Sequence, residues 1–294
     1  MAWTRVTTLA AAATLAAVGA ATASAGAPGS YFLSLCQFSH RAADDPIVLP
    51  RAPGFSHDHS FVGNVTTNAF STDTSLRKAG TSCTPQADTS AYWVPTLYAD
   101  GRPLAPVKAA IYYRRLTTAP VRPFPAGLRM VAGNAHAFRP QSSAVTYWNC
   151  SLLKTTFYGP NGGGSSAITA AASSTVPTCP QKAEVQLHVN FPACWDGKRL
   201  DSFDHRSHMA YARGGQCPAG HPVALPALSL VYMYPARAVD AAKVIMLSSG
   251  GQYSGHADFI NAWNQQGLTK LVRGCLDNGH VLPTLDPTQQ YNHC

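Results

Sequence analysis

Short runs of β-branched and aromatic residues alternate with stretches rich in Pro, Gly and polar residues along most of the chain. Runs of this kind, bounded by turn residues, predict β-strands. The predicted strands are Tyr92–Ala99, Val107–Arg114, Leu128–Ala132, Ala144–Cys150, Glu184–Asn190, Leu228–Tyr234 and Val239–Leu247. Asp100-Gly101-Arg102 between the first two predicts a hairpin, because Asp-Gly suits a tight turn. The Gly-rich stretch Gly159–Ser166 predicts a loop.

One segment near the C-terminus has a helical pattern. From Ala257 onward the apolar residues recur at mostly helical spacing, at Ile260, Trp263, Leu268, Leu271, Val272 and Cys275. Ser254 or Asp258 is the expected N-cap, and Gly279 lies just past the expected end. Many short strands with one helix predict a mainly β fold: a β-sandwich or jelly roll with a C-terminal helix and long loops. No repeat or linker divides the chain, so we expect one domain over residues 26–294.

The first 25 residues have the pattern of a secretory signal peptide. Arg5 precedes the Ala-rich apolar run Leu9–Ala21, and Ala23-Ser24-Ala25 is a small-residue cleavage site. No later apolar run is long enough to cross a membrane. We therefore expect a secreted, extracellular protein without a stable membrane span after cleavage.

All eight cysteines follow this segment, which predicts disulfides. Consecutive pairing keeps every loop local, so we expect the pairs 36–83, 150–179, 194–217 and 275–294. No C-x-x-C pair occurs, which argues against a cysteine zinc knuckle or a redox motif.

Composition narrows the classes of function. Only 12% of residues are charged, about half the share of roughly 25% in typical globular proteins. Glu184 is the only glutamate, which excludes a Glu–Glu catalytic pair within one chain. The net charge is +8, but Lys and Arg are scattered, which argues against nucleic acid as the partner. We expect a monomer whose partner is a polysaccharide.

Three segments concentrate titratable residues: 57–59, 201–208 and 256–258. We expect them to converge in one cleft. If the first is extended, His57 and His59 face one side and Asp58 the other. In the second, Asp204 and His208 share a face in a helix or a strand, which suits a general base or a metal ligand. The candidate site residues are His59, His208 and Asp204, backed by His57, Asp201, His205 and His256. A structural polar network is the alternative, and which metal, if any, is left open.

Several strings together resemble the DUF1996 family, a domain of unknown function in secreted fungal and actinobacterial proteins. They are Thr81-Ser82-Cys83, Tyr92-Trp93-Val94-Pro95-Thr96-Leu97-Tyr98, Gly127–Asn134, Phe191–Gly197, Leu200-Asp201, Asp204–Tyr211, Cys217-Pro218, His221-Pro222-Val223 and His256-Ala257-Asp258-Phe259. They span about residues 50 to 275. At Gly63-Asn64 the chain departs from the Gly-Gly pair of the fungal members.

The resemblance implies a polysaccharide setting, because fungal relatives often carry wall-glycan-binding modules, but it implies no activity. We expect a glycan-cleaving hydrolase or lyase. A hydrolase would draw its carboxylates mostly from Asp201, Asp204, Asp196 or Asp258. A lyase would need a His or Tyr base and an Arg such as Arg206 to neutralise a uronate. The alternative is a non-catalytic glycan-binding or metal-binding wall-associated protein.

Overall fold

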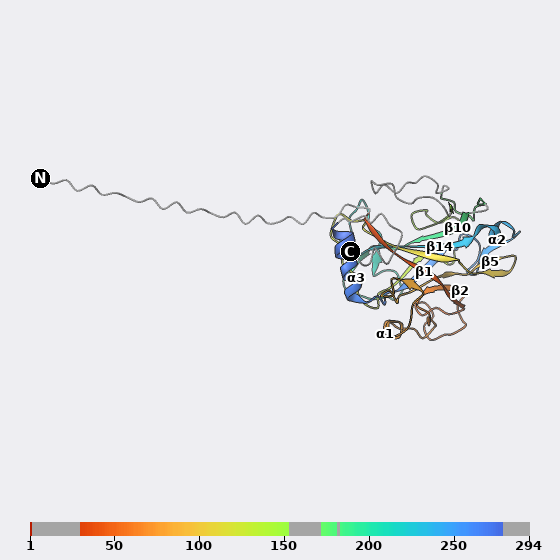
Figure 1. Cartoon of the computed structure of the whole chain (residues 1–294), viewed down its shortest axis with the longest axis horizontal. Helices are drawn as coiled ribbons and strands as arrows, with labels where there is room; N and C mark the ends of the chain where they lie inside the picture. The colour runs from red at the N-terminus through yellow and green to blue at the C-terminus, as the bar shows by residue number, and fades with distance from the viewer. Residues whose placement is uncertain (2–29, 153–171, 181–182, 279–294) are drawn as a thin grey trace.

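The structure is a computed structural model that describes Met1 and residues 30–152, 172–180 and 183–278 (Figure 1). The predicted signal peptide, the predicted loop Gly159–Ser166, Gly279 and Cys294 lie outside the described residues. Among the described residues, no helix is long and apolar enough to span a membrane.

The described chain is mainly β, as predicted. Its strands are β1 (Tyr31–Ala42), β2 (His59–Gly63), β3 (Cys83–Thr84), β4 (Ala91–Pro95), β5 (Leu97–Ala99), β6 (Arg102–Leu104), β7 (Lys108–Arg114), β8 (Arg129–Gly133), β9 (Thr146–Leu152), β10 (Ala183–Asn190), β11 (Cys194–Trp195), β12 (Met209–Ala210), β13 (Val223–Ala224), β14 (Ala227–Pro235), β15 (Ile245–Leu247) and β16 (His256–Ile260). Its helices are α1 (Asp73–Arg77), α2 (Ala236–Asp240), α3 (Gln265–Leu271) and the π-helical η1 (Val272–Asp277).

The main sheet folds into a sandwich at β1. Its strand order is β8-β16-β4-β2-β1-β7-β14-β10-β9, with β3 on β1. The first part of β1 pairs with β7 and the last part with β2, and a register shift between Phe38 and His40 separates the two parts. Such a bulge bends a strand and lets it pass from one layer to the other. The Tyr232 hydroxyl of β14 donates to the Tyr92 carbonyl of β4 at 3.0 Å, so the two layers face each other.

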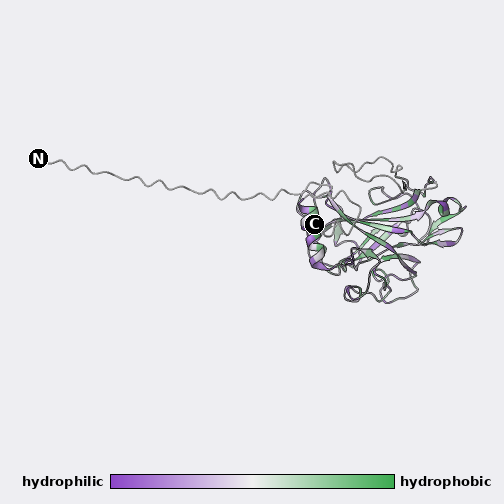
Figure 2. Cartoon of the chain, in the orientation of Figure 1, coloured by the Kyte–Doolittle hydropathy of each residue, from purple (hydrophilic) through white to green (hydrophobic). Residues whose placement is uncertain are grey.

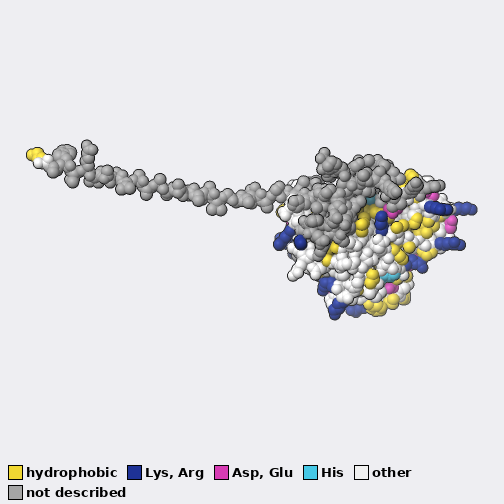
Figure 3. Space-filling model, in the orientation of Figure 1, with side chains coloured by type: hydrophobic (Ala, Val, Ile, Leu, Met, Phe, Trp, Pro, Cys, Tyr) yellow, Lys and Arg dark blue, Asp and Glu magenta, His cyan; other side chains and the backbone are white. Residues whose placement is uncertain are grey.

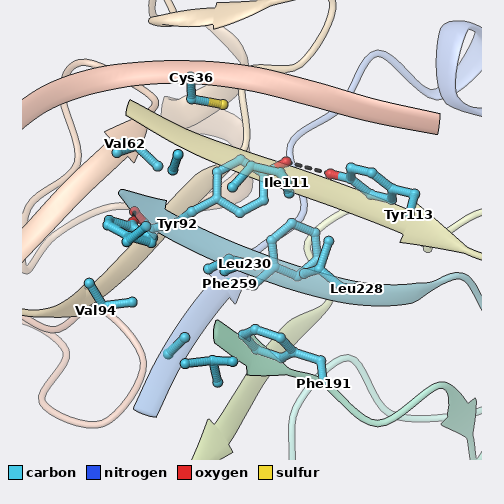
Figure 4. Packing of buried hydrophobic residues seen from close by; sticks show 14 of the residues in the cluster. Cys36, Val62, Tyr92, Val94, Ile111, Tyr113, Phe191, Leu228, Leu230 and Phe259 are labelled. Atoms are coloured by element: carbon cyan, nitrogen blue, oxygen red, sulfur yellow. Dashed lines mark hydrogen bonds between the residues drawn. The ribbon is translucent and has the colours of Figure 1, made fainter. Parts of the chain in front are cut away.

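The main core fills the space between the layers (Figure 4). Buried aromatic rings dominate it, and their polar atoms are bonded to one another. The Tyr92 hydroxyl donates to Asp88 Oδ2 at 2.7 Å and lies in a short contact with the Tyr113 hydroxyl. Trp263 Nε1 donates to the Tyr113 hydroxyl at 2.8 Å. These linked hydrogen bonds satisfy polar groups that would otherwise be costly inside an apolar core.

A second, smaller core lies on the opposite face of the β8-β16-β4-β2 layer. Side chains alternate along a strand, so Val62, Tyr92 and Phe259 enter the main core while their neighbours point the other way. The residues on this other face include Phe61, Trp93, Ile260, Ile47 and Leu76. The face matters because it also carries the candidate site.

The predicted cysteine pairs are confirmed where the structure describes both partners. Disulfides join Cys36 to Cys83, Cys150 to Cys179 and Cys194 to Cys217. Cys275 is also disulfide-bonded, and its predicted partner Cys294 is outside the described residues. The hairpin at Asp100-Gly101 is confirmed too, between β5 and β6, with φ of 49° and 74° at these two residues.

The helix prediction from Ala257 is wrong in its first half. Residues 256–260 form β16, in which both faces are buried, and α3 begins only after the N-cap Asn264. Asp258 is therefore a strand residue and not an N-cap. The predicted strand Val239–Leu247 is also mostly wrong, because α2 covers its start and only β15 is extended. The prediction missed β1 and β2, whose apolar residues are interrupted by Ser, Gln and His.

The surface agrees with the scattered positions of basic residues in the sequence. On the visible face in Figure 3, Lys and Arg are spread out and form no single patch. Helix α3 carries both hydrophilic and hydrophobic residues (Figure 2), and its buried residues are Gly267, Leu268 and Leu271.

Candidate metal centre

Three histidines from distant parts of the chain meet at one end of the β2-β4-β16 layer. His59 is the first residue of β2, His256 is the first residue of β16, and His57 lies in the loop that leads into β2. The Nε2 atoms of His57 and His256 are 3.1 Å apart. One ring nitrogen from each of the three residues lies within 4.8 Å of the other two. Asp58 turns away and contacts Arg41, as the predicted alternation requires.

Backbone carbonyls orient two of these rings. Nδ1 of His59 lies 3.0 Å from the Asp44 carbonyl, and Nδ1 of His256 lies 2.9 Å from the Ser254 carbonyl. A carbonyl only accepts, so Nδ1 carries the proton and Nε2 presents a lone pair. Among the described residues, the buried Nε2 of His59 has no hydrogen-bond partner. Orientation of this kind is typical of histidines that bind metal ions.

The three imidazoles are neutral at ordinary pH. Burial, with the charge of His136, lowers the pKa of His57 to about 4. Burial lowers the pKa of His256 to about 3. Burial and the charges of His57 and His256 hold the pKa of His59 well below its usual range. Neutral imidazole is the form that binds a metal ion, so the site does not have to lose protons from these rings first.

Two buried carboxyl groups lie beside His59. Asp45, Asp258 and His59 form a second set whose potential ligand atoms all lie within 4.8 Å of one another. Oδ1 of Asp45 accepts hydrogen bonds from the Ile47 and Val48 amides at 2.9 Å. Among the described residues, neither oxygen of Asp258 has a hydrogen-bond partner.

Burial raises the pKa of both carboxyl groups. For Asp258 the pKa is well above its usual range, and the neighbouring charge of Asp45 adds to the effect of burial. For Asp45, hydrogen bonds from the Val48 and Ile47 amides partly oppose burial. Buried carboxylates without partners are costly unless they are protonated or bind a cation.

This donor set fits a divalent transition-metal ion. Metal–nitrogen bonds of about 2.1 Å at angles of 90–110° put two ligand nitrogens roughly 3.0–3.4 Å apart, close to the separation of His57 and His256. Three neutral imidazoles suit Zn²⁺ or Cu²⁺. The two carboxylates at Asp45 and Asp258 would balance the charge of one divalent ion. The Trp93 indole also faces Asp45 and lowers its pKa slightly, although Trp93 Nε1 makes no hydrogen bond of good geometry with the described residues.

Gly133 allows β8 to approach β16 closely at His256. The two residues are opposite each other in the strand pairing, and Gly133 has a φ of +80°. A Cβ atom there would lie 2.5 Å from the Gly255 carbonyl oxygen and 2.7 Å from His256 Cα. Only glycine fits this position without moving the backbone that carries His256.

The segment 200–208 covers the free edge of β8. The Arg129 amide donates to the Leu200 carbonyl at 2.9 Å. His208 Nε2 donates to the Arg129 carbonyl at 2.7 Å, and Arg206 Nη2 donates to the Gly133 carbonyl at 2.7 Å. Unpaired edge strands expose a row of backbone groups, and these contacts satisfy them. Many of the polar groups in this segment therefore serve to hold it against β8.

The predicted Asp204–His208 contact is indirect. The Ser202 hydroxyl lies 2.7 Å from Asp204 Oδ1 and 2.9 Å from His208 Nδ1, and joins the two. Asp204 is exposed, and the Ser207 amide, the Ser202 hydroxyl and the Arg206 amide lower the pKa of its carboxyl. His208 is buried, and both of its ring nitrogens contact described atoms. The spacing argument failed here because the segment is an irregular loop.

The candidates thus fall into three groups and not into one set of touching side chains. The first group is His57, His59 and His256. In the second, His205 Nδ1 lies 3.0 Å from Asp201 Oδ1. The third is Asp204 with His208, joined through Ser202.

Sequence reasoning missed Asp45, Trp93 and His136. Asp45 belongs to an Asp-Asp pair in a chain with few charges, which is a usable signal. Trp93 lies opposite both Phe61 and Asp258, a position that only the strand register reveals. His136 lies in the loop after β8, and its charge lowers the pKa of both His57 and His256.

Comparison with known proteins adds a family and no activity. The model of the family described as a domain of unknown function, DUF1996, matches residues 45–263, a range that includes the three histidines and both carboxyl groups. No curated protein and no solved structure matches the chain.

Proposed function

Because the chain belongs to the DUF1996 family, whose description names no activity, we propose a function from the site itself. The protein binds a divalent transition-metal ion through His57, His59 and His256 and uses it on an extracellular polysaccharide. The observation that carries this proposal is the convergence of three neutral imidazoles, two of which have Nδ1 on a backbone carbonyl and therefore keep the lone pair of Nε2 for a ligand.

The arrangement supports metal-based chemistry better than a pair of acid and base carboxylates. Asp45 and Asp258 are buried, which keeps a sugar chain away from them. The half-buried carboxylates of Asp196 and Asp201 are held locally, the first by Arg199 at 2.7 Å and the second by His205 and Arg129. With His57, His59 and His256 as its ligands, a bound metal ion would keep a position for water or substrate and would supply Lewis-acid chemistry there.

Residues of this chain would supply the rest of the site. The Asp44 and Ser254 carbonyls keep the His59 and His256 rings in place. Asp45 and Asp258 provide the negative charge that favours a cation in a buried space. His57 is the least buried of the three ligands, so we place the approaching substrate on its side of the ion.

The polysaccharide part of the proposal rests on the family resemblance and on exposed aromatic rings. Fungal relatives often carry modules that bind wall glycans. Phe55, Phe138 and Phe203 are exposed, and each lies two residues from a histidine of the surrounding loops. Exposed rings offer apolar faces on which sugar rings can stack. Three disulfides suit export to an oxidising compartment.

A non-catalytic protein with a structural metal ion is the second candidate. His59 and His256 are almost fully buried, which is the usual condition of structural sites. A structural ion would raise the thermal stability of the protein without any product from a glycan.

The direct test is metal analysis of the secreted protein purified without a histidine tag. We expect one zinc or copper ion per chain. His57→Ala and His256→Ala should each bind the ion at least about 100-fold more weakly. His221→Ala removes a histidine outside the centre and serves as the control. Full metal loading of His57→Ala, or no loading of the wild type with any divalent transition metal, would contradict the proposal.

Activity separates the two candidates. The metal-loaded protein and the same protein after chelation are incubated with neutral and acidic polysaccharides, and reducing ends and unsaturated uronates are measured. Product that disappears on chelation and returns on reloading supports the enzyme. Glycan binding or metal-dependent stability without any product supports the second candidate.

A further inference from the structure

The guanidinium group of Arg206 is fixed beside the metal centre. Its Nη2 donates to the Gly133 carbonyl at 2.7 Å, and its Nη1 donates to the Val131 carbonyl at 3.4 Å. In the strand pairing, Gly133 is opposite His256 and Val131 is opposite Asp258. The two hydrogen bonds therefore hold a positive charge one strand away from the histidine and the carboxyl group.

Arg206 lacks an acidic partner, unlike its neighbours. Arg199 pairs with Asp196 at 2.7 Å, and Arg129 lies 3.6 Å from Asp201. Within the described part of the chain, no carboxylate lies within ion-pair distance of Arg206, and its side chain is exposed. Its two carbonyl contacts use part of its five N–H donors, and the others remain for a ligand.

The charge of Arg206 acts on the metal centre. Burial is the main cause that lowers the pKa of His256 to about 3, and the nearby guanidinium lowers it further. The same charge opposes the rise that burial produces in the pKa of Asp258. Since Asp45 and Asp258 would balance a divalent ion, Arg206 remains as uncompensated positive charge at the rim.

We propose that Arg206 binds the carboxylate of a uronic acid unit, so that the substrate of this site is an acidic polysaccharide. This inference rests on the proposed function and names its substrate class. A planar guanidinium held on one edge presents the others to a planar carboxylate, and such charge-assisted pairs are roughly twice as strong as neutral hydrogen bonds. A neutral sugar at the same place would leave the charge unpaired.

Two exposed rings stand on the loops that flank this guanidinium. Phe203 comes three residues before Arg206 and is 104% exposed, and Phe138 in the loop after β8 is 82% exposed. Each can offer a ring face to a sugar while Arg206 binds the acidic group, and for Phe138 this is the face opposite the Arg139 guanidinium, which lies 5.6 Å from the ring centre. His136 shares the loop with Phe138.

The test uses matched ligands and matched variants of the full secreted protein loaded with zinc. Polygalacturonate and its fully methyl-esterified form share one backbone, and the ester replaces each charged carboxylate by a neutral methyl ester. Arg206→Gln removes the guanidinium, and Arg206→Lys keeps the charge without the planar fork of donors. Arg213→Gln removes an exposed positive charge on the turn that Arg213 closes with Gln216. Affinity, zinc content and thermal stability are measured for each protein.

We expect the wild type to bind polygalacturonate about tenfold more tightly than its ester, and this preference to weaken with salt. Arg206→Gln should bind both polymers equally, Arg206→Lys should lose part of the preference, and Arg213→Gln should keep it. Zinc content should be the same in all four proteins.

Three results would overturn the inference: equal affinity of the wild type for acid and ester, equal effects of Arg206→Gln and Arg213→Gln, or tighter binding of a sulfated glycan than of polygalacturonate. If Arg206→Gln fails to fold because β8 loses its cover, the acid-to-ester ratio of the wild type and Arg206→Lys still decide. If the wild type takes up no zinc but still prefers the acid to the ester, only the proposed metal site is contradicted. If it takes up zinc but shows no such preference, only this inference is contradicted.

Discussion

The Nε2 atoms of His57 and His256 lie 3.1 Å apart although 199 residues separate the two in sequence. The contact joins the loop before β2 to the start of β16, and His59 completes the group from β2. Nδ1 of His256 faces a carbonyl, so its Nε2 accepts a hydrogen bond from the Nε2–H of His57 at this distance. Two nitrogens that bind one metal ion lie at a similar separation, so a cation can take the place of the shared proton, and this is the geometric basis of the metal proposal.

The pH dependence of metal binding should reveal the low pKa values of the histidines. Ordinary histidines near pKa 6.5 would compete strongly for protons at pH 5. Here the pKa of His57 is lowered to about 4 and that of His256 to about 3. In Asp258→Asn the histidines dominate the pH dependence of zinc binding. The zinc affinity of this variant should change less than about tenfold between pH 7 and pH 5, and it should decrease once the pH is lower than about 4.

The wild type should behave differently, because burial raises the pKa of Asp258. A cation must displace the proton of this carboxyl group, so zinc affinity should rise with pH below that raised pKa. Calorimetry of both proteins across the pH range measures the difference. Parallel pH curves would show that Asp258 takes no part in balancing the ion.

His208→Ala should destabilise the fold and leave the metal centre intact. The change leaves the Arg129 carbonyl and the Ser202 hydroxyl without their buried partner and creates a cavity, with a cost of about 2 kcal/mol or more. Asp204→Asn should lower the melting temperature less, because this carboxylate is exposed. Zinc content of each folded variant is the second measurement. If His208→Ala keeps its normal stability but loses zinc, Asp204 and His208 belong to the functional site instead.

Gly133→Ala should weaken both the fold and metal binding. A Cβ atom at this position overlaps the Gly255 carbonyl oxygen and His256 Cα, so β16 must shift. Gly101→Ala is a matched control, since Gly101 has a similar φ of +74° but nothing within 4 Å of the added atom. We expect the control to lose about 1 kcal/mol from strain alone and Gly133→Ala to lose about twice that or more. Equal losses, with equal zinc affinity, would refute the close-packing argument.

Asp88→Asn should change the pH dependence of stability. Burial raises the pKa of Asp88 to about 6, whereas the unfolded chain has a value near 3.8. The native state therefore holds a proton that the unfolded state releases, and the free energy of unfolding falls as pH rises from about 4 to 6. Asparagine can accept from Tyr92 and cannot titrate, so the variant should lack this loss, which amounts to about 3 kcal/mol at most.

Urea unfolding of both proteins at several pH values measures the Asp88 effect. The buried histidines contribute an opposite slope to both proteins, so the difference between the two curves isolates Asp88. A difference that does not change between pH 4 and pH 7 would mean that Asp88 titrates normally.

The sequence by itself determined the local elements and the covalent links of this protein. Strands such as β7, β10 and β14 are runs of β-branched and aromatic residues bounded by turns, so their extended form follows from local preference and burial. The three described disulfides follow from an even number of cysteines with short separations. The family assignment also follows from strings that can be read directly.

Only the tertiary structure decided the state of residues 256–260. Their apolar positions fit a helix as the start of a longer periodic run, yet this short segment pairs with β4 and β8 along its two edges and is buried on both faces. Pairing with two neighbouring strands outweighs a weak helical preference.

The same pairing decided the site. As a strand, this segment places His256 and Asp258 on one face, where the register of β4 brings Trp93 opposite Asp258, and β2 brings His59 to the same end of the layer. Local sequence can mark such residues as unusual in a chain with few charges. It cannot bring together groups 199 residues apart, because their approach depends on strand order and register, which long-range burial sets.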